Sequence, residues 1–350
     1  MVNIVYSVHG EGMGHAIRSG VVIAHLLRKG HKVLVTSFGR PLVYLQQKGF
    51  NTLSIEGFNI VYRSNKVDLF DTLVYGSLKL PQAARKNIRS FRGVLKSFNP
   101  SLVISDFEPF SEFVHKLYRI PVILINNLHI VKAGKIPVKH RNMLSFLAAR
   151  ITVSLFDCFY DYALITTFFY PKIRGKNIFL FPPLLRENIL SAKPKRGKHL
   201  LVYQTSQSND ALHEVLRKIG IPSVVYGFGR NDTCGQVRYK RFDEEEFFTD
   251  LANCMAVVTN GGFTLITEAI HLKKPLLCFP VEQQFEQMLN AHYVENLGYG
   301  MSAPKTTESS LVRFLKKIDV FQKNLNTRPQ EDNSRLFGFL DELIVQTGYR

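Results

Sequence analysis

The stretch 257-VVTNGGFTLITEAIHLKKPLLCFPVEQQFEQMLNA-291 constrains the fold of this chain more than any other segment. A short apolar run ends at a Gly-Gly pair, an amphipathic segment with helical spacing follows, and a second apolar run, Leu276 to Phe279, comes after Pro275. This order predicts a strand, a tight turn, a helix from about Phe263 and a second buried strand. Glycines let a ligand approach the backbone, and the free amides at a helix start suit a phosphate. The segment predicts a phosphate-binding turn, although the same glycines also suit an ordinary turn.

A carboxylate lies about one turn into the expected helix, at Glu268. It is too far along to cap the helix, and a negative charge suits phosphates poorly, so ribose hydroxyls are its more plausible partners. The segment resembles the donor-binding signature of GT-B glycosyltransferases of the MurG, monogalactosyldiacylglycerol synthase and UDP-glucuronosyltransferase-like families. The resembling residues are Gly261-Gly262, Thr264, Glu268-Ala269, Pro275, Pro280, Glu286-Gln287 and Asn290-Ala291.

The resemblance implies a role for each part of this signature. Residues Gly262, Phe263 and Thr264, beside Gly261, would hold the diphosphate of a nucleotide sugar. Glu268 would bind the ribose. The donor-binding residues that it implies elsewhere are Glu286 and Gln287 on the sugar hydroxyls, Phe242 at the base, and Thr205 and Ser206 near the diphosphate. Core packing is the alternative for Phe242. The Asn-Gly-Gly-Phe opening departs from some of these families and leaves the sugar undetermined.

The N-terminal residues predict a second βαβ unit. An apolar run at residues 2–8 precedes the loop His9-Gly10-Glu11-Gly12-Met13-Gly14-His15, a helix from about Ala16 to Arg28, and a strand at Val33 to Thr36. The glycine spacing is G-x-G-x-G, not G-x-G-x-x-G, and no carboxylate follows the second strand. These differences disfavour a nicotinamide-dependent oxidoreductase.

The loop before this first helix carries the candidate catalytic residue, His15. Its Gly14-His15 pair is similar to the Gly-His opening of the same families, which implies an acceptor-side loop that contains Gly12 and Gly14. The resemblance also implies that Asp106, after a buried strand, orients the catalytic histidine. A helix cap is the alternative for either residue, and an Asx-type turn is another for Asp106. His129 is a further candidate for the acceptor side, or a loop hydrogen bonder.

Charge is uneven along the 350 residues, whose formal net charge is +17. Residues 1–190 hold 25 Lys and Arg against 10 Asp and Glu, a net of +15, which favours an anionic partner for this half. Basic and apolar residues lie side by side over 130–176, which suits an anionic membrane surface or a core-facing helix with a solvated basic side. The stretch 151–170 contains Asp157 and Asp161, so we do not expect it to span a membrane. No motif indicates specific binding of nucleic acid.

We therefore expect a GT-B fold, with two Rossmann-like doubly wound parallel-sheet domains facing a cleft. The expected divisions are an acceptor domain at 1–186, a linker at 187–198, a donor domain at 199–332, and a C-terminal helix at 333–350 that packs back on the N-terminal domain. The four cysteines show no paired spacing, so reduced thiols in the cytoplasm are expected, with peripheral contact to the inner face of the cell membrane left open.

The expected activity is inverting transfer from a UDP-sugar to a hydroxyl of a lipid-linked or otherwise anionic acceptor. No cofactor and no metal is expected, because the chain lacks an Asp-x-Asp triplet and a helix dipole can stabilise the leaving diphosphate. Two alternatives stay open: a GT-B-fold nucleotide-sugar epimerase, and a non-catalytic module that binds nucleotide sugars or anionic lipids.

Overall fold

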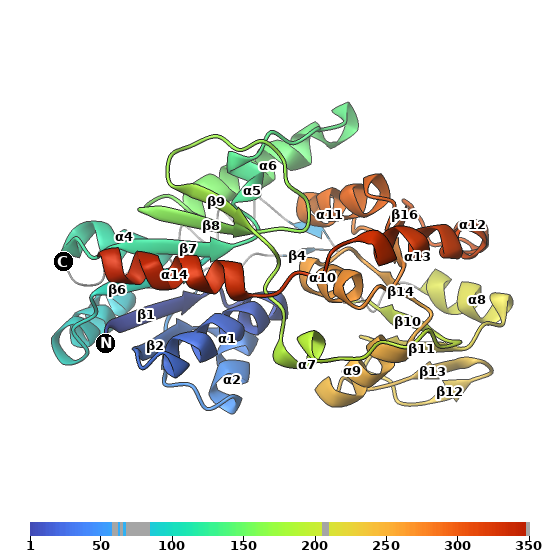
Figure 1. Cartoon of the computed structure of the whole chain (residues 1–350), viewed down its shortest axis with the longest axis horizontal. Coiled ribbons are helices and arrows are strands. Elements are labelled where there is room, and N and C mark those ends of the chain that lie inside the picture. The colour runs from blue at the N-terminus through green and yellow to red at the C-terminus, as the bar shows by residue number, and fades with distance from the viewer. Residues whose placement is uncertain (58–61, 64–65, 68–84, 205–209, 348–350) are drawn as a thin grey trace. The chain divides into compact units, whose positions relative to one another are not determined.

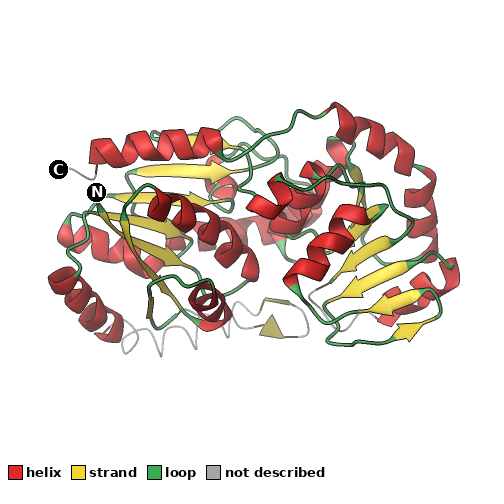
Figure 2. Ribbon diagram, turned by 60° about the horizontal axis from the view of Figure 1, so that its bottom comes forward, coloured by secondary structure: helices red, strands yellow, loops and turns green. Residues whose placement is uncertain are grey.

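The computed structural model describes residues 1–57, 62–63, 66–67, 85–204 and 210–347. The chain forms two compact units, one of Met1–Leu184 with Asp332–Arg350 and one of Leu185–Glu331. The sequence placed a linker at 187–198, and these residues lie within the second unit. Each unit has strands with helices on both sides, as Figure 2 shows.

The first unit is built on a seven-stranded sheet in the order β3-β2-β1-β6-β7-β8-β9, and all of its pairings are parallel. The strands are β1 (Asn3–Val8), β2 (Lys32–Ser37), β3 (Thr52–Ser54), β6 (Leu102–Asp106), β7 (Val122–Asn126), β8 (Tyr162–Thr166) and β9 (Ile178–Phe181), with β4 (Tyr62–Arg63) and β5 (Lys66–Val67) as a separate antiparallel pair. The strand order reverses between β1 and β6, where Val8 is in register with Asp106. Open parallel sheets bind ligands at such a switch point.

The helices of the first unit pack around this sheet (Figure 1). They are α1 (Met13–Arg28), α2 (Gly39–Gln47), α4 (Pro109–Tyr118), α5 (Ile130–Ala133), the 3-10 turn η1 (His140–Asn142), α6 (Met143–Phe156) and α14 (Ser334–Thr347), and residues 85–97 are also helical. The expected start of α1 at Ala16 is three residues late, because the helix begins directly after Gly12, whose φ is 81°. The stretch 151–170 is divided between the end of α6 and β8.

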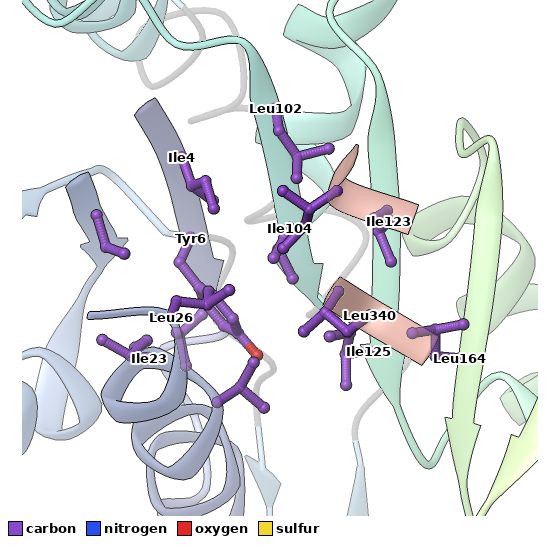
Figure 3. Packing of buried hydrophobic residues seen from close by; sticks show 14 of the residues in the cluster. Ile4, Tyr6, Ile23, Leu26, Leu102, Ile104, Ile123, Ile125, Leu164 and Leu340 are labelled. Atoms are coloured by element: carbon purple, nitrogen blue, oxygen red, sulfur yellow. The ribbon is translucent and has the colours of Figure 1, made fainter. Parts of the chain in front are cut away.

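The C-terminal helix α14 completes the hydrophobic core of the first unit. Leu336, Leu340, Leu343 and Ile344 are buried with apolar residues of β1, α1, β6 and β7. Figure 3 shows Leu340 beside Ile125 and Leu164. His25 stacks on Phe337 with ring centroids 3.9 Å apart, and its Nε2 lies 2.8 Å from Asp341. Residues separated by more than 300 positions thus belong to one core.

The second unit has a sheet of the same kind, in the order β12-β13-β11-β10-β14-β15-β16, in which only the β12–β13 pairing is antiparallel. Its strands are β10 (Leu200–Tyr203), β11 (Ser223–Tyr226), β12 (Thr233–Cys234), β13 (Val237–Tyr239), β14 (Ala256–Thr259), β15 (Leu276–Cys278) and β16 (Gly300–Ser302). Its helices are α7 (Glu187–Leu190), α8 (Asp210–Ile219), α9 (Glu244–Asn253), α10 (Phe263–His271), α11 (Phe285–Asn296), α12 (Glu308–Lys316) and α13 (Ile318–Thr327). The two doubly wound parallel sheets confirm the predicted fold class.

In this sheet the strand order reverses between β10 and β14, where Tyr203 is in register with Thr259. The Gly-Gly turn follows β14 directly, so the predicted phosphate-binding turn lies at the switch point of the second unit. None of the helices in the described residues is long and apolar enough to cross a membrane.

Candidate active site

The structure brings His15 and Asp106 together, although 91 positions separate them. His15 lies in the first turn of α1, and Asp106 is the last residue of β6. The two side chains approach to 2.8 Å between His15 Nδ1 and Asp106 Oδ1. The imidazole is 14% exposed, while the carboxylate is fully buried. A carboxylate oxygen can only accept, so in the tautomer with the proton on Nδ1 this nitrogen donates to Asp106 and Nε2 is available to a substrate. Arg18 Nη2 also lies 2.6 Å from Nδ1.

Two further side chains of α1 bind the same carboxylate, and sequence reasoning missed both. Arg18 Nε donates to Asp106 Oδ2 at 2.7 Å and Arg18 Nη2 to Oδ1 at 2.5 Å, while Ser19 Oγ donates to Oδ2 at 2.9 Å. Arg18 Nη1 also donates to the side-chain oxygen of Asn127 at 2.5 Å. The available signal was the spacing of His15 and Arg18, since residues three apart share one face of a helix.

The charge on Asp106 depends on Arg18. Burial is the largest single effect and raises the pKa of this carboxyl group, but Arg18 and His15 together outweigh it, and the pKa of Asp106 falls from 3.8 to about 2. The carboxylate is therefore ionised at neutral pH. An ionised carboxylate beside Nδ1 fixes the tautomer of the ring and stabilises the imidazolium that forms when Nε2 takes a proton.

A second imidazole, His9, lies beside His15, and sequence reasoning did not identify its environment. The two ring centroids are 5.3 Å apart, and the edges of Phe38, Phe107 and Phe156 also meet His9. Burial, with the nearby His15, lowers the pKa of His9 from 6.5 to about 3. Among the described residues its Nδ1 has no hydrogen-bond partner. His9 therefore adds a neutral, largely aromatic wall to the His15 site.

The other predicted acceptor-side residues differ in how they are placed. Gly12 is exposed and precedes α1, and Gly14 lies in the first turn of that helix. His129 is buried, and both of its ring nitrogens are engaged, Nδ1 with Asp157 at 2.9 Å and Nε2 with the Tyr160 hydroxyl at 3.1 Å. This arrangement matches the hydrogen-bonding alternative for His129, because its ring would have to give up a partner to bind an acceptor.

The turn before α10 contains two glycines that lie in different surroundings. Gly261 has a φ of 99°, and a side chain there would collide with the backbone of α11. Gly262 is exposed, has an ordinary extended backbone with φ −63° and ψ 135°, and would have nothing within 4 Å of an added Cβ. The fold therefore requires glycine at the first position only. Phe263 is buried and Thr264 half-buried in the first turn of α10.

Glu268 is buried on α10 and is held by an arginine that the sequence analysis did not identify. Arg186 donates to Glu268 Oε1 from Nε at 2.9 Å and from Nη2 at 2.5 Å, and its Nη1 donates to Glu244 at 2.9 Å. The guanidinium also lies 4.0 Å from the ring centroid of Phe248. Burial raises the pKa of Glu268, and Arg186 opposes that rise. Within the described residues all hydrogen bonds to this carboxylate reach Oε1.

The loop before α11 and the start of that helix support the Gly-Gly turn. Gln287 Oε1 accepts from the amide of Val281 at 3.0 Å, and Asn290 Nδ2 donates to the carbonyl of Gly261 at 3.1 Å. Glu286 lies in the first turn of α11 and is half-buried. The side-chain oxygen of Gln287, predicted to bind the donor sugar, is thus already used within the protein.

Phe242 is 56% exposed, so core packing, the alternative for this residue, is wrong. Its ring lies over an aromatic group at the ends of β10 and β11, with centroids 6.3 Å from Tyr203, 6.4 Å from Tyr226 and 5.4 Å from Phe247. An exposed ring at this edge of the sheet is available to stack on a base. Thr205 and Ser206 lie outside the described residues. Among the described residues no group of three His, Cys, Asp or Glu side chains has an arrangement that could hold a metal ion.

Relatives and solved structures identify the family and the fold of this chain. An uncharacterized glycosyltransferase of Methanosarcina acetivorans is 25% identical and covers 97% of this chain and 95% of its own length. A UDP-N-acetylglucosamine–N-acetylmuramyl-(pentapeptide) pyrophosphoryl-undecaprenol N-acetylglucosamine transferase of Geobacillus thermodenitrificans is 32% identical over 31% of this chain and 34% of its own.

Two solved structures share the fold over the whole chain. The glycosyltransferase of kitacinnamycin superposes with a TM-score of 0.70 at 15% identity and covers 98% of this chain and 99% of its own. Phytolacca americana UGT2, complexed with UDP-2fluoro-glucose and pterostilbene, gives 0.69 at 12% identity and covers 99% of each chain. The family model described as glycosyl transferase family 1 matches residues 2–319. This chain therefore belongs to glycosyl transferase family 1 and is a glycosyltransferase with the GT-B fold.

Proposed function

We propose that this glycosyltransferase moves a sugar from a UDP-sugar to a hydroxyl of a lipid-linked or otherwise anionic acceptor, with inversion and without a metal ion. The observation that carries the proposal is the 2.8 Å contact between His15 Nδ1 and Asp106 Oδ1 at the switch point of the first sheet. This contact leaves Nε2 of the partly exposed His15 ring to act as the base, next to a fully buried carboxylate.

The chemistry follows from this arrangement. His15 Nε2 takes the proton of the acceptor hydroxyl, and the oxygen forms a bond to the anomeric carbon as the bond to the diphosphate breaks. Attack occurs on the face opposite the leaving group, so one displacement inverts the configuration. General-base assistance of this kind contributes about 10²- to 10⁴-fold to a rate. Asp106 stabilises the imidazolium that forms.

For the donor, the second unit supplies a site that needs no metal. The start of α10 directs free backbone amides and the positive end of the helix dipole toward the space at Gly262, where a leaving diphosphate would gain stabilisation. The names of two similar proteins support UDP as the nucleotide of the donor. The Phytolacca structure is a complex with UDP-2fluoro-glucose, and the Geobacillus relative is named for UDP-N-acetylglucosamine. In the proposed complex Glu268 Oε2 accepts hydrogen bonds from the ribose hydroxyls.

The acceptor assignment rests on charge and on one exposed helix face. Of the formal +17 charges, +15 fall in residues 1–190, and the Geobacillus relative is named for an undecaprenol-linked substrate. Helix α6 exposes an apolar stripe at helical spacing, formed by Leu144, Leu147, Ile151 and Leu155. Lys139, Arg141 and Arg150 lie next to it in the sequence. Apolar and basic groups together fit a membrane surface that contains anionic lipid.

The experiment that tests this function incubates the protein with a panel of labelled nucleotide sugars and lipid extracts. Transfer of label from a UDP-sugar into the lipid phase, in the presence of a chelator, is the expected result. Release of an altered nucleotide sugar without an acceptor would instead identify an epimerase. Binding without any turnover would identify a non-catalytic module, and a chelator-sensitive transfer would contradict metal independence.

A further inference from the structure

Arg18 has no part in the mechanism above, yet its environment is unusual for an arginine. Its side chain is 6% exposed, donates twice to Asp106 and once to Asn127 at 2.7 Å or less, and also lies within hydrogen-bond distance of His15 Nδ1. Two of these donors form a bidentate fork, a geometry that fixes the plane of the carboxylate. The orientation of Asp106, and with it the direction of Oδ1 toward His15, therefore depends on Arg18.

Arg18 also acts on the charge of the site. Its Nη2 lies 2.6 Å from His15 Nδ1, and both nitrogens are within hydrogen-bond distance of Asp106 Oδ1. Titratable groups in contact with the His15 ring include Asp106 from β6, Arg18 from α1 and His9, which directly follows β1. His9 is uncharged at neutral pH, since burial lowers its pKa to about 3. The charges of the Asp106 carboxylate and the Arg18 guanidinium offset each other beside the ring.

We propose that Arg18 is a positioning residue for the general base, which fixes Asp106 and balances its charge so that the His15 ring stays neutral and able to accept a proton. The inference rests on the proposed function in taking His15 as the base. Without Arg18, a buried carboxylate with no counter-charge would stabilise the imidazolium before the substrate arrives. A ring that already carries both protons cannot act as a base.

The direct test follows the protonation of the His15 ring by ¹⁵N NMR of the full chain labelled at histidine, with the signal assigned from the His15→Ala spectrum. In Arg18→Met, the pH at which both ring nitrogens carry protons should rise by roughly one to three units, the effect of a nearby charge. Arg18→Lys keeps the positive charge and should shift this pH midpoint less. An unchanged midpoint in a folded Arg18→Met protein would overturn the proposal.

A double variant covers the case in which Arg18→Met does not fold with an unpaired buried carboxylate. Arg18→Met with Asp106→Asn removes both charges of the buried pair and again leaves the ring in neutral surroundings. Its midpoint should therefore lie near that of the wild-type protein. A midpoint more than one unit above the wild-type value would show that charge balance does not set the state of the ring.

Kinetics separate this role from a structural one. In Arg18→Met, kcat/KM at neutral pH should fall once the midpoint reaches the assay pH, by about tenfold for each further unit of rise, and should recover at higher pH. In the His15→Ala background the same substitution should cost little more, because Arg18 acts through His15. A loss that is independent of pH and additive with His15→Ala would assign Arg18 to folding alone. Normal transfer by His15→Ala would refute the proposed function instead, while the NMR midpoints would still report on Arg18.

Discussion

Asp106 links the active site to stability, because its carboxylate is buried and its pKa of about 2 lies below the ordinary value of 3.8. A carboxyl group with a lowered pKa in the folded state adds stability that is present above about pH 4 and is lost as the pH falls toward 2. The difference corresponds to roughly 2 kcal/mol of unfolding free energy.

The measurement compares urea unfolding of the wild-type protein with that of Arg18→Met/Asp106→Asn between pH 6 and pH 2. The stability difference between the two should change by about 2 kcal/mol, in favour of the variant, as the pH falls through this window. His9 is common to both proteins, so its own effect largely cancels. A difference that stays constant with pH would show that Asp106 titrates normally.

Glu268 and Arg186 give a second prediction about single residues. If Oε2 of Glu268 accepts the ribose hydroxyls, Glu268→Ala should weaken UDP binding by at least about tenfold, the effect of one hydrogen bond to a charged group. Binding of 2′,3′-dideoxy-UDP should change much less. Calorimetry with both nucleotides measures this selectivity.

Arg186→Met is the matched control, since it breaks the same ion pair and keeps the carboxylate. It should affect both nucleotides alike. If Glu268→Ala also affected both nucleotides alike, the carboxylate would be a partner of Arg186 and not a ribose ligand.

At the scale of elements, the start of α10 is the feature that the donor site depends on most. Gly262 has open space around it and a backbone conformation that any residue adopts. Threonine is about as good as glycine at this N-cap position, so Gly262→Thr should change stability by less than about 0.5 kcal/mol. The added side chain should nevertheless exclude a diphosphate and lower UDP affinity by tenfold or more.

Gly338→Ala is a suitable control for this experiment, because Gly338 of α14 is equally open and belongs to the first unit. It should leave UDP affinity unchanged. Wild-type affinity in Gly262→Thr would mean that the diphosphate does not approach the backbone at the start of α10.

Helix α6 carries the prediction about the membrane. Replacing Ile151 and Leu155 by serine removes two exposed apolar side chains from the stripe and should lower binding to vesicles with anionic lipid by tenfold or more. Binding should also fall as salt rises, because the Debye length drops from about 10 Å at 0.1 M to 3 Å at 1 M. Co-sedimentation at two salt concentrations provides the measurement.

Serine at Val43 and Val345, two exposed apolar residues on α2 and α14, is the matched control and should leave vesicle binding unchanged. An equal loss from both pairs of substitutions, or equal binding to neutral vesicles, would remove α6 and its charges from the account of the acceptor.

Across the whole molecule, the sequence predicted the strands, helices and turns that depend on local residue patterns. Continuous apolar runs predicted strands buried on both faces, and the Gly-Gly pair predicted the turn between β14 and α10. The start of α1 was predicted three residues late, because Gly12 carries no side chain that would mark a helix cap.

What the sequence could not predict depends on contacts between distant residues. Arg18 and Asp106 are 88 positions apart, and Arg186 and Glu268 are 82 apart. A buried arginine is indistinguishable from an exposed one until its partner is known. For the same reason the bonds of His129 to Asp157 and Tyr160 became evident only in the folded chain.

The transfer rate of His15→Ala, relative to that of the wild-type protein, shows whether His15 is the general base of the proposed transfer. We expect a loss of roughly 10²- to 10⁴-fold with nearly unchanged UDP affinity, because in the proposed complex the base acts on the acceptor hydroxyl while α10 of the second unit binds the donor. Near-normal transfer by His15→Ala would show instead that His15 is a structural residue of α1.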